Sequence, residues 1–261
     1  MVEFEIIHIA LAPPDVLDNS LIGKVAVIIG KDLYNTRLLL AGKIPKIIAH
    51  YSTKDQADTV DQSLRILGLT AMVFGDAELR KQSDSFRAYT AEFRQSEILF
   101  GNRSGQTIKI ETDNTFLMLK GIIRTHKEKE VTTTKTKLNI PLTALSGGIP
   151  IMRKVKENAK EVTLREEYFL RFYGRNSMEP IVEILQNDFD YSSLGSQMGS
   201  SSIVNFNVLV TNIIKILPRV IFDDRLIRYY AADSSSNTLN TVEVNCRLIV
   251  SFSQLINSSR S

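Results

Sequence analysis

The chain has 261 residues, of which 43% are hydrophobic and 23% are charged, so it can bury a core without disulfides or a metal ion. Its formal net charge of +3 lies well short of the bias expected of a dedicated nucleic-acid binder. The single cysteine, Cys246, excludes an internal disulfide framework and a zinc site built from cysteines.

Two further features of the sequence bear on the location of the protein. No basic stretch precedes an apolar core at the N-terminus, so we expect no signal peptide. The longest apolar run, residues 203–222, is interrupted by Asn205, Lys215 and Pro218, which favours a buried helix over a transmembrane segment. We therefore expect a cytoplasmic protein, and the sequence predicts no cofactor.

Residues 1–76 predict a small domain with the element order β-α-α-β-α-β. Asp32 can cap the second helix and Ser52 or Thr53 the third, while Gly68 is typical of a helix end. Such an order of strands and helices packs as a two-layer sandwich. The predicted elements are strand 4–11, helix 21–29, helix 33–41, strand 46–51, helix 53–67 and strand 69–74.

Four short motifs mark the element boundaries of this segment. They are Lys24-Val25, Ile44-Pro45-Lys46, Thr53-Lys54-Asp55-Gln56-Ala57 and Leu64-Arg65-Ile66-Leu67-Gly68. In these motifs and in the order of elements, the segment resembles the C-terminal domain of the ribosomal large-subunit stalk protein. The N-degron adaptor of the Clp protease shares that fold. The resemblance covers less than a third of the chain and implies the sandwich fold.

The resemblance also has a functional implication. The stalk domain docks translation factors through lysines on its first two helices. Lys24 matches one such position, whereas Leu38 stands where the family has a lysine. The second helix therefore has a more apolar surface than the family pattern, and we expect this surface to pack against the rest of the chain.

The remainder of the chain predicts a second domain, so the expected class is α+β. Residues 77–92 are polar and lack a sustained apolar face, which predicts a linker. Over residues 93–232 a period of two predicts mostly antiparallel strands, with an apolar helix over 202–217 covering them. By shape alone this plan is similar to a pleckstrin-homology-like barrel. The predicted strands are 98–100, 107–111, 116–123, 131–137, 168–173 and 180–185.

The last part of the chain, residues 233–261, predicts a flexible spacer followed by a C-terminal segment. Ser and Asn dominate the spacer at 233–238. Residues 242–256 alternate in polarity and then become apolar, so they form either a last strand and helix or a tail that needs a partner.

A basic stretch is the main candidate for a binding site. Between residues 120 and 160 there are ten Lys or Arg against three Glu, and clustered cations bind phosphates of RNA or of anionic lipid. The alternative is a solvated edge strand, where lysines prevent sheet-to-sheet aggregation. The candidate binding residues are Lys120, Arg124, Lys127, Lys129, Lys135, Lys137, Arg153, Lys154 and Lys156.

Carboxylates and histidines supply two weaker candidates. Asp188, Asp190, Asp223 and Asp224 can hold Mg²⁺ for a hydrolase, or can simply cap turns and pair with neighbouring arginines. His8 and His50 lie on neighbouring predicted strands, but no cysteine or glutamate joins them at the spacing of a metal site, which favours structural roles.

Three functional hypotheses follow from the sequence. The first is a non-enzymatic interaction or adaptor protein that binds another protein, since no catalytic pattern stands out. The second is a phosphate-facing binder of RNA or anionic membrane through residues 120–160. The third is a metal-dependent hydrolase that uses the four aspartates.

Overall fold

The structure is a computed structural model of the whole chain. It describes the backbone of residues 5–138, 152–229 and 241–258, and the side chains of residues 5–125, 165–229 and 241–258. The chain divides into two compact units, of which the first comprises residues 1–123 and 167–261 and the second residues 124–166. The chain contains both helices and strands, and several of the strand pairs are antiparallel, which confirms the α+β class.

The N-terminal sandwich, residues 7–75, has the predicted order of elements. Asp18, Asp32 and Thr53 accept hydrogen bonds from backbone N–H groups in the first turns of the three helices, as N-caps do. Gly30 ends the first helix in the left-handed conformation with φ of 66°. The elements are β1 (Ile7–Leu11), α1 (Asn19–Ile29), α2 (Leu33–Leu40), β2 (Lys46–Tyr51), α3 (Lys54–Ile66) and β3 (Ala71–Gly75).

The first sheet has the strand order β2-β1-β3, and both pairs are antiparallel. Side chains of a strand alternate between the two faces of its sheet. Ile9 and Leu11 pack against α1, α2 and α3 in one core, whereas Ala10 and Phe74 belong to a separate core on the opposite face. The first sheet therefore buries both of its faces.

The second sheet has five strands in the order β11-β8-β9-β10-β4. The pair of β9 and β10 is antiparallel, whereas β4 runs parallel to β10 and β11 runs parallel to β8. A third sheet, β5-β6-β7, is antiparallel throughout. The strands are β4 (Phe86–Ala88), β5 (Thr90–Phe93), β6 (Glu97–Gly101), β7 (Thr107–Glu111), β8 (Leu117–Leu138), β9 (Met152–Tyr173), β10 (Pro180–Leu185) and β11 (Ile221–Leu226).

The segment 77–92 differs from the predicted linker. It contains β4, most of β5 and most of the short helix α4 (Asp76–Arg80). Leu79 is fully buried in the core on the second face of the first sheet. Leu79 is the buried residue of α4, and a search for a sustained apolar face does not detect a contact made by one side chain.

The predicted covering helix is confirmed as α6 (Ser202–Ile216), which follows the 3₁₀ helix η1 (Tyr191–Gln197). Phe206, Leu209 and Ile213 of α6 are fully buried against residues of both the second and the third sheet. Two separate sheets thus contribute to this core, which differs from the single barrel that the shape analogy suggests.

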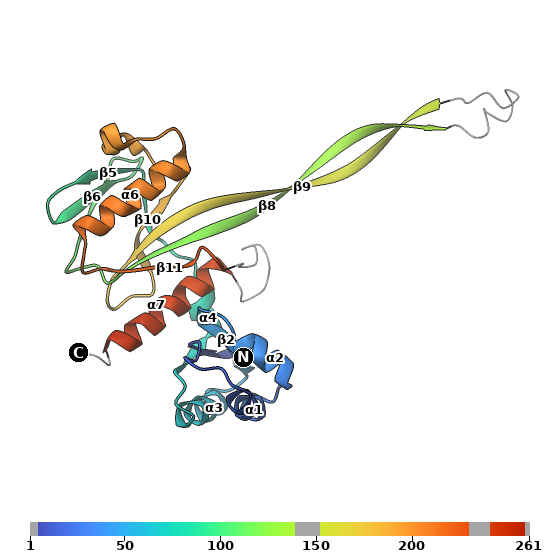
Figure 1. Cartoon of the computed structure of the whole chain (residues 1–261), viewed down its shortest axis with the longest axis vertical. Helices are drawn as coiled ribbons and strands as arrows, with labels where there is room; N and C mark the ends of the chain where they lie inside the picture. The colour runs from blue at the N-terminus through green and yellow to red at the C-terminus, as the bar shows by residue number, and fades with distance from the viewer. Residues whose placement is uncertain (1–4, 139–151, 230–240, 259–261) are drawn as a thin grey trace, which may run out of the picture. The chain divides into compact units, whose positions relative to one another are not determined.

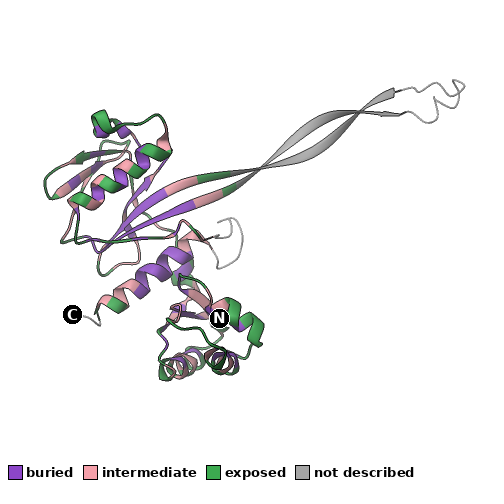
Figure 2. Cartoon of the chain, viewed as in Figure 1, coloured by how far each residue is buried: buried purple, intermediate pink, exposed green. Residues whose placement is uncertain are grey.

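The C-terminal segment forms the helix α7 (Val242–Ser258), and the spacer predicted at 233–238 lies outside the described residues. Helix α7 is labelled in Figure 1, and nine of its consecutive residues, from 244 to 252, are buried (Figure 2). Val244, Leu248 and Phe252 pack on the first sheet, while Cys246 and Ile249 pack on the second. Helix α7 is therefore buried from two sides, because it fills the space between two sheets.

The described residues of the second unit are 124–138 of β8 and 152–166 of β9, and each of these strands has 22 residues in total. These strands are neighbours in the second sheet. At the start of the unit, Arg124 Nε donates to Glu166 Oε1 over 2.7 Å. In the described ranges, no helix combines the length and the apolar character that crossing a bilayer requires.

Candidate functional site

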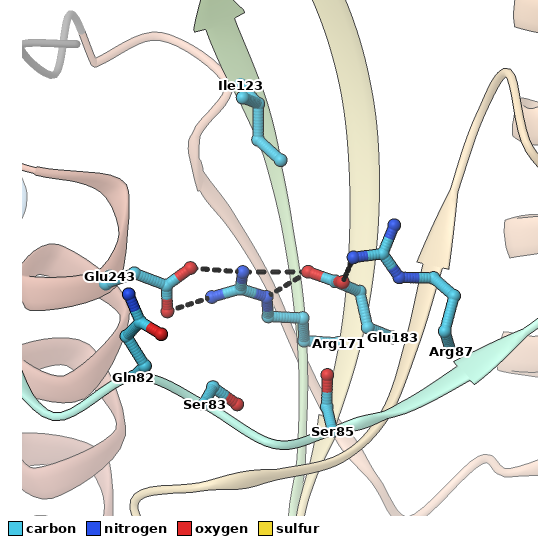
Figure 3. Close-up of a pocket in the computed structure, with 8 residues that line it drawn as sticks. All are labelled: Gln82, Ser83, Ser85, Arg87, Ile123, Arg171, Glu183 and Glu243. Atoms are coloured by element: carbon cyan, nitrogen blue, oxygen red, sulfur yellow. Dashed lines mark hydrogen bonds and ion pairs between the residues drawn. The ribbon is translucent and has the colours of Figure 1, made fainter. Parts of the chain in front are cut away.

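A cleft of about 470 Å³ opens beside the N-terminal end of α7 (Figure 3). Most of its lining is polar, and four of the lining side chains carry charge. Ile123 is the apolar exception. The lining residues are Gln82, Ser83, Ser85, Arg87, Ile123, Arg171, Glu183 and Glu243.

Three charged residues of the cleft form a ladder across neighbouring strands. Glu183 of β10 lies directly opposite Arg171 of β9 and directly opposite Arg87 of β4. Glu183 Oε1 accepts from Arg171 Nε over 2.8 Å, and Glu183 Oε2 pairs with Arg87 Nη2, also over 2.8 Å. Sheet register alone brings these groups together, since directly opposite side chains on one face are neighbours.

The ladder continues onto α7. Arg171 Nη1 donates to Glu243 Oε2 over 2.8 Å, so this guanidinium is bracketed by two carboxylates. One turn further along α7, Arg247 donates to Glu179 Oε1 over 2.8 Å and to the carbonyl oxygen of Lys81 over 2.7 Å. Glu243 and Arg247 are four residues apart, yet each pairs with another part of the chain. They therefore fix the register of α7 against the sheet.

Each charged side chain of the cleft pairs with another charged side chain of the cleft, and this pairing limits the chemistry that the cleft can perform. Arg171 and Glu183 are only 4% and 3% exposed, and buried charges are stable only when they are paired. Cys246 lies close to Arg171, and burial raises the pKa of its thiol to about 12, so it is protonated and a poor nucleophile. The arrangement of these groups fits the attachment of α7 better than catalysis.

A second polar constellation joins β1, β2 and α4. His8 Nδ1 lies 2.7 Å from His50 Nδ1, and His8 Nε2 lies 2.9 Å from Asp76 Oδ1. Arg80 Nε donates to both oxygens of Asp76 over 2.8 and 2.9 Å. His8 is only 1% exposed, whereas His50 is exposed. The sequence placed these histidines on neighbouring strands, and the structure adds Asp76 as their partner.

The environment shifts the pKa values at both ends of this constellation. Burial favours the neutral form of Asp76, but hydrogen bonds from Arg80 and His8 outweigh burial and keep its pKa below the ordinary value. Burial, then the charges of His8 and Lys31, lower the pKa of His50, and Asp76 offsets part of that effect. Near neutral pH, Asp76 is therefore ionised and His50 is neutral.

The helices α1 and α2 present the third candidate, which we call the α1–α2 surface. It consists of the exposed apolar side chains of Val27, Leu33, Tyr34 and Leu38, which are 84%, 61%, 71% and 52% exposed. The expectation that Leu38 packs against the rest of the chain is therefore wrong. Thr36 and Leu40 form the buried face of α2, so Leu38 lies on its exposed face.

The charged residues around the α1–α2 surface are mainly cations. Lys24, Lys31 and Arg37 are all exposed on or between the two helices. The nearby Asp18 and Asp32 act as N-caps, where their negative charge faces the positive end of a helix dipole. The charge that remains for a partner is therefore positive.

The nine residues predicted to bind phosphate differ in their location and contacts in the structure. Lys120 is 9% exposed and donates to Asn207 Oδ1 over 2.7 Å, and burial lowers its pKa. Arg124 pairs with Glu166. Neither side chain therefore fits the predicted surface site. Lys127, Lys129, Lys135 and Lys137 belong to β8, and Arg153, Lys154 and Lys156 to β9, but their side chains lie outside the described residues.

Three of the four candidate aspartates each have a separate structural contact, and Asp224 is exposed. Asp188 pairs with Arg103 over 2.7 Å, and Asp223 pairs with Arg225 over 2.6 Å. Asp190 caps η1. Across the described ranges, no group of three or more His, Cys, Asp or Glu side chains is arranged to hold a metal ion. The hydrolase hypothesis therefore lacks a site among the aspartates that motivated it.

Sequence reasoning missed the ion ladder of the cleft, although a signal for it exists. Arg171 is the only charge in the apolar strand 168–173, and Glu183 is the only charge in 180–185. Opposite charges in two apolar strands that a short turn connects indicate a cross-strand pair. Glu243 gives no such signal, because it reaches Arg171 from a helix 72 residues away in the sequence.

Comparison with known proteins gives no relatives for this chain. No protein family, no curated protein and no solved structure matches its sequence or its fold.

Proposed function

We propose that the protein is a non-enzymatic interaction protein that docks an acidic, amphipathic helix of a partner protein on the α1–α2 surface. The observation that supports the proposal most directly is the exposure of four large apolar side chains on two adjacent helices. Contiguous exposed apolar area costs solvation free energy and commonly marks a binding surface.

The arrangement of side chains along α2 supports a helical partner. Tyr34 and Leu38 are four residues apart and so lie on the same face of α2, opposite the buried Thr36 and Leu40. Val27 lies on the outer side of α1, away from its buried residues. A pair of helices with apolar outer positions matches the regularly spaced apolar residues of a partner helix.

The positive charges near the α1–α2 surface favour a partner helix that is acidic. Lys24 lies on α1, Arg37 on α2 and Lys31 between the two helices, and all three side chains are exposed. Attraction between these cations and an acidic helix accelerates association and rejects basic competitors. Since these charges are exposed to solvent, the attraction weakens as the salt concentration rises.

The proposal can be tested with a defined probe and the full chain. A short amphipathic helical peptide with leucines on one face and glutamates around them is titrated into the labelled protein, and backbone amide shifts are followed by NMR. We expect saturable shifts confined to α1, α2 and the turn between them, with affinity that falls as salt is added. The same peptide with lysines in place of glutamates is expected to bind at least about tenfold more weakly.

A pair of matched variants distinguishes specific binding at this surface from nonspecific binding to exposed apolar side chains. Leu38→Ser is expected to abolish the shifts, whereas Ile66→Ser is expected to leave them unchanged, because Ile66 is 85% exposed on α3. Equal effects of the two variants, or shifts spread over the whole chain, would show that the α1–α2 surface is no docking site.

A second candidate function, phosphate binding, has one specific observation in its favour. The basic runs of 127–137 and 153–156 belong to β8 and β9, which are neighbouring strands of one sheet. A two-stranded ribbon that carries two basic runs concentrates positive charge, and phosphates of RNA or lipid favour such clusters.

Salt dependence tests this second candidate. Binding to single-stranded RNA and to vesicles with anionic lipid is measured for the full chain and for a variant in which Lys135 and Lys137 are both replaced by Gln. We expect the variant to bind more weakly and with a shallower dependence on salt. Identical salt slopes for the two proteins with both ligands would remove this candidate.

A further inference from the structure

The cleft beside α7 carries charge of opposite sign at its two ends (Figure 3). Its charged side chains follow one another in the order Glu243, Arg171, Glu183 and Arg87, and each pairs with the next. The middle pair is buried, whereas the side chains of Glu243 and Arg87 are 37% and 51% exposed. A ligand in the cleft therefore meets a carboxylate at one end and a guanidinium at the other.

Both end groups keep hydrogen-bonding capacity for a ligand. Within the described chain, Arg87 pairs with Glu183 through Nη2 over 2.8 Å, and its remaining N–H donors are left for other acceptors. Each carboxylate oxygen of Glu243 accepts from Arg171 and keeps a second lone pair. An arginine binds a carboxylate strongly, and a carboxylate likewise binds an ammonium group. The two ends therefore suit a ligand that carries both a carboxylate and an ammonium group.

The lining between the two ends fits a short peptide chain. The Oγ atom of Ser83 is buried and has no hydrogen-bond partner among the described residues. A buried polar atom in this state costs free energy unless a ligand or water satisfies it. A hydroxyl both donates and accepts, so Ser83 and Ser85 can bind the N–H and C=O groups of a peptide bond. Ile123 supplies an apolar contact for an aliphatic side chain.

We propose that the cleft binds a zwitterionic dipeptide with aliphatic side chains, with its ammonium group on Glu243 and its carboxylate on Arg87. Two arginines and two glutamates line the cleft, so their charges cancel and a ligand without net charge is favoured. The volume of about 470 Å³ lies within the range of small-molecule sites. The cleft shares no residue with the α1–α2 surface, so the inference does not rest on the proposed docking function.

The spacing of the end groups favours a dipeptide over a single amino acid. The Arg171–Glu183 pair lies between Glu243 and Arg87, so a ligand that reaches both ends must carry its charges several bonds apart. The two termini of a dipeptide meet this condition. In an α-amino acid both charged groups are attached to one carbon, so it can reach only one end at a time.

The test measures binding of alanyl-leucine and leucyl-alanine to the full chain by calorimetry, with NMR to locate the site. We expect saturable binding, with backbone shifts at residues 82–87, at Ile123 and in the first turn of α7. Acetylation of the ammonium group and amidation of the carboxylate are each expected to weaken binding by on the order of tenfold or more, because hydrogen bonds between charged groups are lost. Free alanine and free leucine are expected to bind more weakly than either dipeptide.

A matched pair of arginine variants shows whether Arg87 contacts the ligand. Arg87→Gln is expected to weaken binding of alanyl-leucine by about tenfold and to leave binding of its C-terminal amide unchanged, because the amide lacks the carboxylate. A purely structural effect of the substitution would weaken both ligands. Arg103→Gln is the control, because Arg103 also pairs with a carboxylate, that of Asp188, but lies outside the cleft.

Several results would overturn the proposal. They are the absence of dipeptide binding up to the millimolar range, equal affinity for the free and the amidated dipeptide, and tighter binding of leucine than of either dipeptide. Equal effects of Arg87→Gln and Arg103→Gln, or shifts that lie outside the cleft, would also overturn it.

Discussion

Helices α2 and α7 differ in how far their composition is reflected in their burial. Three of the eight residues of α2 are large apolar side chains that lie at least half exposed, namely Leu33, Tyr34 and Leu38. In contrast, α7 buries Asn245 and Arg247 together with its apolar residues. Composition alone does not separate the two helices, because apolar residues make up more than half of each.

The difference lies in what surrounds each helix. Helix α7 lies between two sheets and meets partners for its charges, such as Glu179 for Arg247 and Arg171 for Glu243. Helix α2 has a single neighbouring layer and therefore one buried face. The comparison shows that burial in this protein depends on the number of surrounding layers. The exposed apolar side chains of α2, namely Leu33, Tyr34 and Leu38, are left outside the core within the described chain.

The largest expected effect comes from removing Arg171, whose guanidinium pairs with Glu243 of α7. In Arg171→Ala, Glu183 loses one of its two arginine partners and Glu243 loses its guanidinium, so we expect the free energy of unfolding to fall by about 3–5 kcal/mol. Urea denaturation measures this change. Arg87→Ala serves as the control, because Arg87 is half exposed and its pair should contribute about 1 kcal/mol or less. Similar losses in both variants would mean that burial of the ladder is unimportant.

A matched pair of leucines sharpens the comparison between the two helices. Leu248 of α7 is 1% exposed and Leu38 of α2 is 52% exposed. Leu248→Ala leaves a cavity on the first sheet and is expected to cost about 2–5 kcal/mol of stability. Leu38→Ala is expected to change stability by about 0.5 kcal/mol or less. Thermal and urea unfolding of both variants provide the measurement, and a large loss in Leu38→Ala would contradict the open surface of α2.

The smallest expected effect is a dependence of stability on pH in the N-terminal sandwich. The pKa of His50 is lowered on folding, so below its unfolded value of about 6.5 the unfolded chain binds more protons than the folded one. Stability is therefore fully present above that pH and decreases as the pH falls below it. Unfolding midpoints between pH 7 and pH 5 should decline less in His50→Gln than in wild type. Parallel curves would show that His50 titrates normally.

Much of the N-terminal sandwich could be predicted from the sequence because its signals are local. Asp18, Asp32 and Thr53 are caps that act within three residues, and Gly30 and Gly68 end helices where they stand. Each signal needs only the neighbouring residues for its interpretation. The element boundaries therefore agree closely with the predicted ones.

The rest of the fold depends on contacts that no local pattern contains. The strand β11 includes Asp223 and Asp224, which interrupt its apolar alternation, and it pairs in parallel with β8 more than 100 residues earlier. Helix α7 has two apolar stripes, one for each sheet, so a search for one apolar face finds neither clearly. For the same reason, the sequence could predict neighbouring strands for His8 and His50 but could not predict Asp76 beside them.

The place of α7 in the chain has a consequence for synthesis. Helix α7 follows β3 by more than 160 residues. During synthesis, α7 can therefore pack on the second face of the first sheet only after nearly the whole described chain has left the ribosome. At cellular elongation rates this delay is on the order of ten seconds. During that time Ala10, Phe74 and Leu79 lie uncovered, and a chain that stops before α7 keeps this apolar sheet face open to chaperones and proteases.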